Sequence, residues 1–472
     1  MRARIPIVIL GAGPAGLGAA LQLARRGCFD VTVVERASEV GGNAGSFEIE
    51  GLRVDYGSHR LHPACPPPIM ADIQAMLGKE LLERPRHGRI RLRGRWVHFP
   101  LKPADLAVNL PPGFLLGVLR DAMMRLGRPF RQGDNFQTAL ELGLGRTICR
   151  DFYFPYARKI WGVLPSALDA EQARRRVSAG SLGKMVRKVL NAVPGFRSNG
   201  GGRFFYPRDG YGAISEAYCR EALRAGTALK LRTSVTGVEL ENGRAVAVRT
   251  HSEEGDARLP ARQILSTIPV TALARAVCPS PPAAVLSAAS ALKFRAMILV
   301  YLVLDVDRFT EYDAHYFPDA QVRITRLSEP KNYSLAPMPG KTVLCAELPC
   351  STDDSVWSSS DGALGQLVVD ALAAVDLRLT VPVRQVIIRR LPQAYPIYSR
   401  DYRQHFDRLD QWVNDINGLV AFGRQGLFAH DNTHHTLAMA YALNECLDDD
   451  AGLNRQKWQG FRQSFQQHVV ED

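Results

Sequence analysis

Glycines and one acid near the start of the chain have the spacing needed to hold a nucleotide. Gly11, Gly13 and Gly16 follow the apolar run 7–10 and open a helical pattern, and Glu35 ends the next apolar run. Gly11 allows a tight turn, Gly13 lets a pyrophosphate approach the backbone, and Gly16 lets the helix pack closely on the strand. The start of the helix offers free amides to phosphate, and the carboxylate of Glu35 can accept ribose hydroxyls. These residues predict a dinucleotide-binding unit of strand, helix and strand.

A second glycine cluster narrows the choice of dinucleotide. Glu35 and Arg36 are followed after a few residues by Gly41, Gly42 and Asn43. A nicotinamide-binding domain usually continues from the acid straight into another helix and strand, whereas a second glycine cluster at this distance suits FAD. Glycines that served only as turns would leave the acid and the second cluster together unexplained. The pattern therefore favours FAD over NAD.

The rest of the sequence carries no second GxGxxG unit. Reductases that take electrons from NADPH commonly have a dedicated second nucleotide domain. We therefore expect the electrons to come from the substrate or from an outside donor.

Length and composition indicate a large globular enzyme. At 472 residues the chain is too long for one simple core, so two lobes are expected. The longest apolar run, 296–304, is shorter than a membrane span and rich in strand formers, which predicts a buried strand in a soluble protein. The eight cysteines lie without CxxC spacing, so we predict no metal site, no redox dithiol and a reducing, cytoplasmic setting.

The charge of the chain is strongly positive. Lysine and arginine number 59 against 47 acidic residues, a formal net charge of +12, and the basic residues gather at 84–95, 174–176 and 184–188. Such a balance suits an anionic partner, although each cluster is equally well explained as a solvated face. No interleaving of aromatic and basic residues accompanies the clusters, so nucleic acid is not expected. An anionic small-molecule substrate is expected instead, and peripheral contact with an anionic membrane surface stays open.

The elements that must position these residues alternate along the chain. Strands are predicted at 203–207 and across 230–244, where Asn242 and Gly243 mark a hairpin turn. Strands at 297–306 and 341–347 with a helix across 361–375 indicate a separate sheet, and the chain returns to the cofactor unit at 418–424.

We therefore predict an α/β fold, in which a GxGxxG-type, Rossmann-like FAD-binding domain carries a discontinuous substrate lobe made of an antiparallel sheet and a helical insertion. The FAD-binding domain is expected to comprise residues 1–65, 203–275 and 410–472, with a helical insertion at 66–202 and a sheet-containing substrate domain at 276–409.

Further motifs give the chain a resemblance to a known group. It resembles the FAD-dependent flavoproteins called amine-oxidase-like or protoporphyrinogen-oxidase-like, and its motif layout is most similar to that of UDP-galactopyranose mutases. The resemblance runs nearly end to end, through the segments 51–62, 154–162, 209–212, 325–331 and 423–432.

The resemblance implies roles for particular residues. His59 and His62 are expected beside the flavin, and Arg326 is expected to reach the active site as an anion or oxyanion partner. The alternative for His59 is a histidine with a structural role, and the alternative for Arg326 is a surface arginine paired to Glu329. Trp161 is expected as a flat wall against the substrate, or else as part of the core. The other residues implied in substrate binding are Arg158, Tyr395 and Phe428, and those implied in cofactor binding are Gly11, Gly13, Pro14, Ala15, Gly16, Glu35, Arg36, Gly42, Asn43, Val235, Gly423, Arg424, Asn432 and Thr433.

The chain departs from the mutases where they hold the diphosphate of a sugar nucleotide. One of their two clamping tyrosines corresponds to Phe428, which has no hydroxyl, while Tyr395 retains the other. A loop arginine of the mutases falls at Ala179, although the arginines at 174–176 lie close by in the sequence. Losing a charge-assisted hydrogen bond to a phosphate costs about 1.5–3 kcal/mol, which puts the mutase substrate in doubt.

Two functions remain for the predicted cleft. The first is an FAD-dependent oxidoreductase, an oxidase or dehydrogenase, acting on an anionic small molecule, and the alternative is a redox-neutral sugar-nucleotide mutase. A non-catalytic flavin-binding protein is disfavoured by the retained histidines and arginine. The basic segment 181–205 is a candidate lid because glycines flank it, and the sequence sets no oligomeric state.

Overall fold

The apolar runs at the start of the chain form a parallel sheet, as expected. The computed structural model describes residues 3–124, 133–176, 202–335 and 338–470. In it, β1 (Ile5–Leu10) lies between β2 (Phe29–Val34) and β13 (Gln263–Ser266). β20 (Leu419–Ala421) and β9 (Ala228–Lys230) complete this five-stranded sheet at its two edges. Strands buried on both faces can be continuously apolar, and β1 has this character from Ile7 to Leu10.

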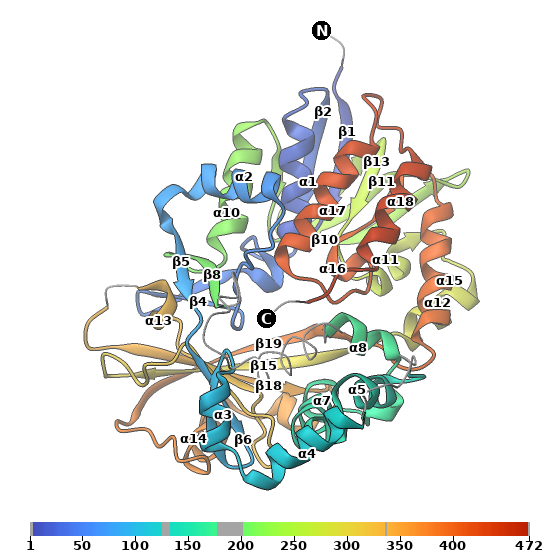
Figure 1. Ribbon diagram of the computed structural model, residues 1–472. Coiled ribbons are helices and arrows are strands. Elements are labelled where there is room, and N and C mark those ends of the chain that lie inside the picture. Colours follow the sequence, from blue (N-terminus) through green and yellow to red (C-terminus); the bar gives the residue numbers. More distant parts are fainter. Residues whose placement is uncertain (1–2, 125–132, 177–201, 336–337, 471–472) are drawn as a thin grey trace.

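Helices cover this sheet and bring the start and the end of the chain together. α1 (Pro14–Ala24) packs against α10 (Ala213–Arg224) and α17 (Thr433–Cys446) in one apolar core. α2 (Pro67–Leu77) adds Ile69 and Ile73 to the same core, although it follows residue 65. Figure 1 shows these helices side by side in the upper lobe.

A four-stranded sheet flanks this lobe on its other side. The hairpin predicted at Asn242 and Gly243 is confirmed: it joins β10 (Ser234–Glu241) to β11 (Arg244–Ser252). Both turn residues have positive φ, 48° and 75°, as a two-residue hairpin loop requires. The second core of this lobe lies beneath that sheet, and the elements that complete the sheet and core are β12 (Gly255–Pro260), β14 (Val277–Cys278), α11 (Val270–Ala276), α12 (Ala283–Ala291) and α15 (Tyr402–Asp415). α18 (Arg455–Phe465) packs on α17 in the first core instead.

The lower lobe is built on a seven-stranded sheet (Figure 1). The strands predicted at 297–306 and 341–347 are confirmed within β15 (Lys293–Leu304) and β18 (Thr342–Cys350), which pair antiparallel. The helix predicted across 361–375 is α14 (Asp361–Ala373), which packs on this sheet. β19 (Val383–Ile397) pairs with β15 on its other edge, and β17 (Arg326–Ser328) and β16 (Ala314–Tyr316) follow β18 in the sheet.

The segment 66–202, expected as a helical insertion, contains strands as well. β6 (Gly88–Leu92) and β7 (Arg95–Phe99) extend the seven-stranded sheet through β16, and β5 (Leu81–Pro85) pairs with β8 (Arg203–Pro207). The basic cluster at 84–95 concealed the strand pattern: Ile90 and Leu92 are buried on one face while arginines alternate with them. The helical part consists of α3 (Pro103–Asn109), α4 (Pro112–Met123), α5 (Phe136–Leu144), α6 (Arg146–Ile148), α7 (Phe154–Trp161) and α8 (Ala170–Arg176).

Two smaller features bear on the site. β3 (Ser46–Ile49) and β4 (Leu52–Asp55) form a hairpin that leads into the loop carrying His59 and His62. α16 (Gly423–Gly426) precedes α17. Across the described residues, no helix combines the length and the apolar character needed to cross a membrane. All eight cysteines are free thiols.

Candidate active site

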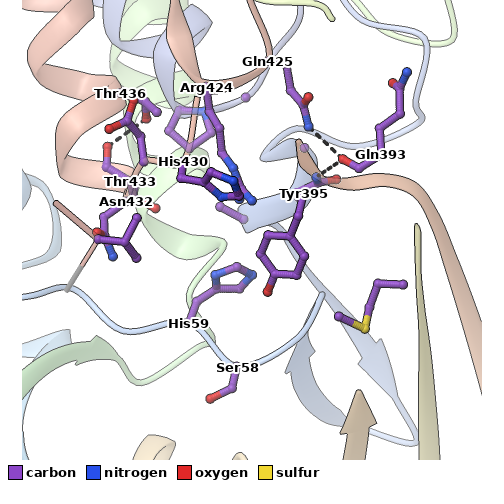
Figure 2. A pocket seen from close by; sticks show the side chains of 18 of the residues that line it. Ser58, His59, Gln393, Tyr395, Arg424, Gln425, His430, Asn432, Thr433 and Thr436 are labelled. Carbon is purple, nitrogen blue, oxygen red and sulfur yellow. Dashed lines mark hydrogen bonds between the residues drawn. The ribbon is translucent and has the colours of Figure 1, made fainter. Parts of the chain in front are cut away.

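A cavity of about 960 Å³ lies where the two lobes meet. The first glycine turn, the second glycine cluster and the start of α17 line its cofactor side, and α5, α7 and α8 line its other side. Large clefts between two parts of a molecule are typical ligand sites. Figure 2 shows part of this cavity.

The first glycine turn has the open backbone that a pyrophosphate needs. Gly11 has φ +100°, which only glycine adopts readily, and a side chain on Gly13 would meet nothing within 4 Å. A methyl group on Gly16 would instead lie 2.0 Å from the carbonyl oxygen of Gly11. Gly16 therefore packs helix against turn and does not itself line the cavity, whereas Gly11, Gly13, Pro14 and Ala15 do.

The acid and the second glycine cluster lie beside this turn. Glu35 accepts the N–H groups of Ala12 and Ala37, both at 2.9 Å, and lines the cavity together with Arg36. Gly42 (φ +54°) approaches the Cα of Gly13, so the two glycine clusters adjoin. The other residues that line this side as expected are Asn43 and Val235.

The last motif closes the cofactor side of the cavity. Arg424 donates to the carbonyl oxygen of Ala394 at 2.6 Å, and its Nε is buried with no hydrogen-bond partner among the described residues. Asn432 is the N-cap of α17 and lies with Thr433 in the cavity lining (Figure 2). Gly423 lies behind the lining, where a side chain would collide with Ala15. Open glycine backbone, a helix start and a buried guanidinium with unused donors together fit the diphosphate of FAD.

His59 enters the cavity from the loop after β4. Its Nε2 donates to the carbonyl oxygen of Tyr56 at 3.0 Å, and its ring stacks on Tyr211 with centroids 5.3 Å apart. Burial lowers the pKa of His59, although the nearby carboxyl of Asp55 opposes this effect. The imidazole is therefore neutral at neutral pH, with the lone pair of Nδ1 available in the cavity. His62 also lines the cavity, and its Nδ1 accepts the N–H of Ala64 at 3.1 Å.

Arg326 lies in the cavity lining, but its charge is balanced. Its Nε and Nη2 donate to Glu347 Oε1 at 2.9 and 2.5 Å, and Nη2 also donates to the carbonyl oxygen of Ser58. The alternative pairing with Glu329 does not form. Glu329 is buried elsewhere and accepts the N–H groups of Phe309 and Thr310.

Arg60 was not singled out from the sequence, although it lies between His59 and His62. Its guanidinium is 3.2 Å from Asp313 and lies over the ring of Phe204 at 5.0 Å. It also donates to the hydroxyl of Tyr316 at 3.2 Å. Like Arg326, Arg60 therefore presents a charge that an acid already compensates.

A different arginine faces the cavity without an acidic partner. Arg176, the last residue of α8, has its guanidinium 5.0 Å from the ring of Tyr395 and 5.8 Å from that of Trp161. Its Nε is buried, and none of its donors meets an acceptor among the described residues. Arg424 lies on the same tyrosine at 5.3 Å (Figure 2). Burial, together with Arg176 and Arg424, keeps the pKa of His430 well below its ordinary value.

We name the group Arg176, Arg424, Tyr395, Trp161 and His430 the anion corner. It gathers cations and hydrogen-bond donors around a neutral histidine. The sequence suggested only that one of the arginines at 174–176 could replace the loop arginine of the mutases. The position that corresponds to that arginine by direct alignment, Ala179, lies outside the described residues. The basic cluster 184–188 and most of the candidate lid 181–205 lie outside them as well.

An aromatic wall extends the cavity away from the cofactor side. Trp161 packs edge-on against Phe136 at 5.5 Å, and both belong to the core of the helical part of the lower lobe. Trp161 is thus both core and cavity wall. No sequence pattern links the aromatic members of the wall, because they come from separate segments of the chain: Phe99, Phe136, Phe152, Tyr153, Tyr156, Trp161 and Tyr316.

Two residues implied in substrate binding lie elsewhere. Arg158 is exposed on α7 and does not line the cavity, because the face of the helix that carries Ala157 and Trp161 points inward instead. Phe428 is 1% exposed and packs between Phe294 and Tyr398 in the core of the upper lobe. Its missing hydroxyl therefore does not face the cavity.

The C-terminal segment covers one edge of the cavity. Val469 and Val470 line it, and the N–H of Val470 donates to the carbonyl oxygen of Arg175 at 2.8 Å. His468 Nδ1 lies 3.0 Å from Asp431 Oδ1. Asp431, His435 and His468 bring potential metal-ligand atoms within 4.8 Å of one another. However, Nδ1 of His435 already accepts the N–H of Asn432, so these contacts are explained as an anchor for the C-terminal segment.

Comparisons with known proteins agree with this architecture. Phytoene dehydrogenase of Streptomyces griseus is 30% identical over 276 residues, which are 52% of this chain and 52% of that protein. The match thus spans about half the length of that relative. Reduced UDP-galactopyranose mutase has a similar structure, with a TM-score of 0.79 and 19% identity, over 99% of this chain and 100% of that chain. Cyclohexylamine oxidase of Brevibacterium oxydans gives a TM-score of 0.64 and 16% identity, over 94% and 99%.

The two structural likenesses are at low identity and show a shared fold. The sequence of residues 14–420 matches the flavin containing amine oxidoreductase family, which covers both lobes and the cavity between them. The chain therefore belongs to the flavin containing amine oxidoreductase family, and its cofactor is FAD.

Proposed function

We propose that this protein is an FAD-dependent oxidoreductase, an oxidase or dehydrogenase, that acts on a small anionic molecule bound in the cavity. The observation that carries the proposal is the guanidinium of Arg176, which faces the cavity without an acidic partner among the described residues. Arg176 is half-buried, and its buried Nε–H leaves a hydrogen-bond donor unsatisfied, which is costly unless a ligand pairs with it. A carboxylate or phosphate of the substrate would supply both the charge and the acceptors.

The chain's own residues have distinct tasks in such a reaction. When bound, FAD supplies the acceptor for a hydride leaving the substrate. Arg176 and the hydroxyl of Tyr395 hold the anionic group, and Trp161 with the aromatic wall excludes water. Nδ1 of His59 is the atom we assign to take a proton from a substrate hydroxyl or amine, because Nε2–H is engaged with Tyr56.

A sugar-nucleotide mutase with no net redox change is the second candidate. It is favoured by the anion corner itself, where an arginine, a tyrosine and a tryptophan come together as the resemblance to the mutases implies. Against it, the position that corresponds to the second tyrosine of the clamp is Phe428, which is buried in a core and has no hydroxyl.

The test of the anion corner compares two arginines on one helix. Arg176→Gln should weaken the binding of inorganic pyrophosphate about tenfold or more. Binding is measured through the change that pyrophosphate causes in the flavin absorption spectrum. The control Arg174→Gln changes an exposed side chain that pairs with Glu171 and should bind as the parent enzyme does. Equal binding by both variants would remove the basis of the proposal.

The two candidate reactions separate in anaerobic experiments. An oxidoreductase should bleach the oxidised flavin when mixed with its anionic substrate, and a panel of carboxylated and phosphorylated compounds with oxidisable C–H bonds is the search set. A mutase should instead convert UDP-galactofuranose after dithionite reduction, with the flavin still reduced at the end. Conversion would replace the oxidoreductase proposal by the mutase.

A further inference from the structure

Helix α4 lies at the tip of the lower lobe, far from the parallel sheet of the upper lobe (Figure 1). Its inner face is fixed by packing: Phe114 is 5% exposed, and Gly117 lies against the side chain of Thr147. The carboxylate of Asp121 accepts the N–H of Thr147 at 2.6 Å. These contacts set the rotation of the helix, and therefore which residues face outward.

The outward face of α4 is apolar. Leu116, Leu119 and Met123 are 65%, 43% and 64% exposed, and spacings of three and four residues place them on one stripe of the helix. Val108 of the preceding helix is 83% exposed. A surface helix normally carries polar residues opposite its buried stripe, so a helix that is apolar on both faces needs a second apolar environment.

The charged residues around this face are almost all basic. In the described parts of 91–164, Asp134 is the one exposed acid, whereas the exposed bases come from the strands, helices and loops of the same region. Among them, the side chains of Arg120, Arg146 and Arg150 are 64%, 83% and 69% exposed. Each pairs with an acid, but these acids, Asp121, Glu141 and Asp151, are only 9%, 26% and 12% exposed, so the cations form the outer surface. An apolar stripe with basic flanks complements the surface of an anionic lipid bilayer, where apolar side chains enter the interface and cations meet lipid phosphates.

We propose that the outward face of α4, with Val108, docks this enzyme onto an anionic lipid bilayer. The proposal does not depend on the reaction catalysed. The inner face of α4 packs through Phe114 into the same apolar core as Phe136 and Trp161 of the aromatic wall, so the helix lies on the side of the cavity away from the glycine turns.

The test is sedimentation of the full-length FAD enzyme with vesicles. Binding is expected with phosphatidylcholine vesicles that contain about 30% phosphatidylglycerol, and it should be much weaker with phosphatidylcholine alone. The double variant Leu116→Ser/Met123→Ser should partition at least about tenfold less, because both apolar anchors are lost. Raising the salt to about 1 M shortens the Debye length to about 3 Å and should weaken binding further.

Controls separate docking from folding and from self-association. Leu223→Ser removes a leucine that is 45% exposed on α10 of the other lobe, and it should leave binding unchanged. If the double variant unfolds, Val108→Ser probes the same surface with a side chain that makes few contacts. The proposal is overturned if the parent enzyme ignores anionic vesicles, if binding is equal in parent and variants, or if light scattering shows a dimer that the double variant dissociates while vesicle binding persists.

Discussion

At the scale of single residues, partners decide what each side chain can do. Arg326 and Arg176 both face the cavity, but Glu347 neutralises the first and no described acid neutralises the second. Glu347 also accepts the N–H of Ser58 at 3.0 Å, so it connects the loop that carries His59 and His62 to the seven-stranded sheet. Arg326 is therefore better suited to hold the geometry of the cavity wall than to attract an anion, and Arg176 has the opposite character.

Replacing Glu347 tests the positioning role of this pair. Glu347→Gln leaves Arg326 as an uncompensated, nearly buried cation and should lower the free energy of unfolding by about 3–5 kcal/mol. Asp449→Asn is the matched control, because Asp449 pairs with Arg26 at the surface with its own side chain 81% exposed; a much smaller change than in Glu347→Gln is expected. Urea unfolding measures both. Similar losses in the two variants would contradict a structural role for Glu347.

The lowered pKa of His59 predicts how the rate of flavin reduction depends on pH. Burial, the largest effect, lowers the pKa of His59, with a further lowering from Arg326 and opposing effects from Asp55 and Glu347. A lowered pKa keeps the base form populated below pH 6.5, where an ordinary histidine protonates. The rate of flavin reduction should therefore stay constant as the pH falls to 6.5 and decline only below it. A decline centred above pH 6.5 that disappears in His59→Gln would show that the pKa is not lowered.

At the scale of elements, the glycine motif around the start of α1 has one glycine that serves cofactor binding and another that serves folding. Gly13 and Gly16 belong to the same motif, yet their surroundings differ. Space beside Gly13 is open for a phosphate, whereas Gly16 touches the backbone of the turn. The element therefore needs one glycine for the cofactor and another for its own packing.

Alanine at these two positions should give different defects. Gly13→Ala should fold with nearly the parent stability in the absence of FAD but bind FAD much more weakly, because its methyl group occupies space for the pyrophosphate. Gly16→Ala should destabilise the apoprotein, because the turn must move to relieve a 2.0 Å contact. Thermal unfolding of the apoproteins and flavin titration measure the two effects. Equal apoprotein stability in both variants would contradict this division.

At the scale of the whole molecule, the cavity joins the two lobes. We propose the division into an FAD-binding domain and a substrate domain given by the sequence, with α2 attached to the FAD side because Ile69 and Ile73 pack there. Both lobes and the C-terminal segment contribute to the cavity lining. A ligand bound in the cavity therefore contacts segments that are hundreds of residues apart in the sequence.

Removing FAD should consequently lower the stability of the whole molecule. Ligand bound only to the folded state stabilises it by about 2.7 kcal/mol at a free concentration of 100 times the Kd. Unfolding of the apoprotein should occur at a lower temperature than that of the holoprotein, and added FAD should restore the midpoint in a concentration-dependent way. A midpoint that is unaffected by FAD would show that the cavity is not the cofactor site.

The sequence by itself determined the cofactor unit, because its chemistry is local. The first glycine motif, Glu35 and the second glycine cluster lie within 35 residues of one another. The periodicity of apolar residues predicted the strands at the start of the parallel sheet, together with β15, β18 and α14. The strands β6 and β7 were missed because arginines alternate with their buried residues, so the pattern resembled a charge cluster.

Only the tertiary structure decided the substrate side. Arg176, Tyr395 and His430 are separated by long stretches of chain, and nothing in their local sequence shows that the two lobes bring them together. The same holds for Arg158 and Phe428: the resemblance implied that both bind substrate, but the side chain of Arg158 faces solvent and that of Phe428 lies in a core. The pairing of Arg326 with Glu347 depends on the register of β17 and β18. Contacts between distant segments are set by packing and register, and a local pattern does not encode them.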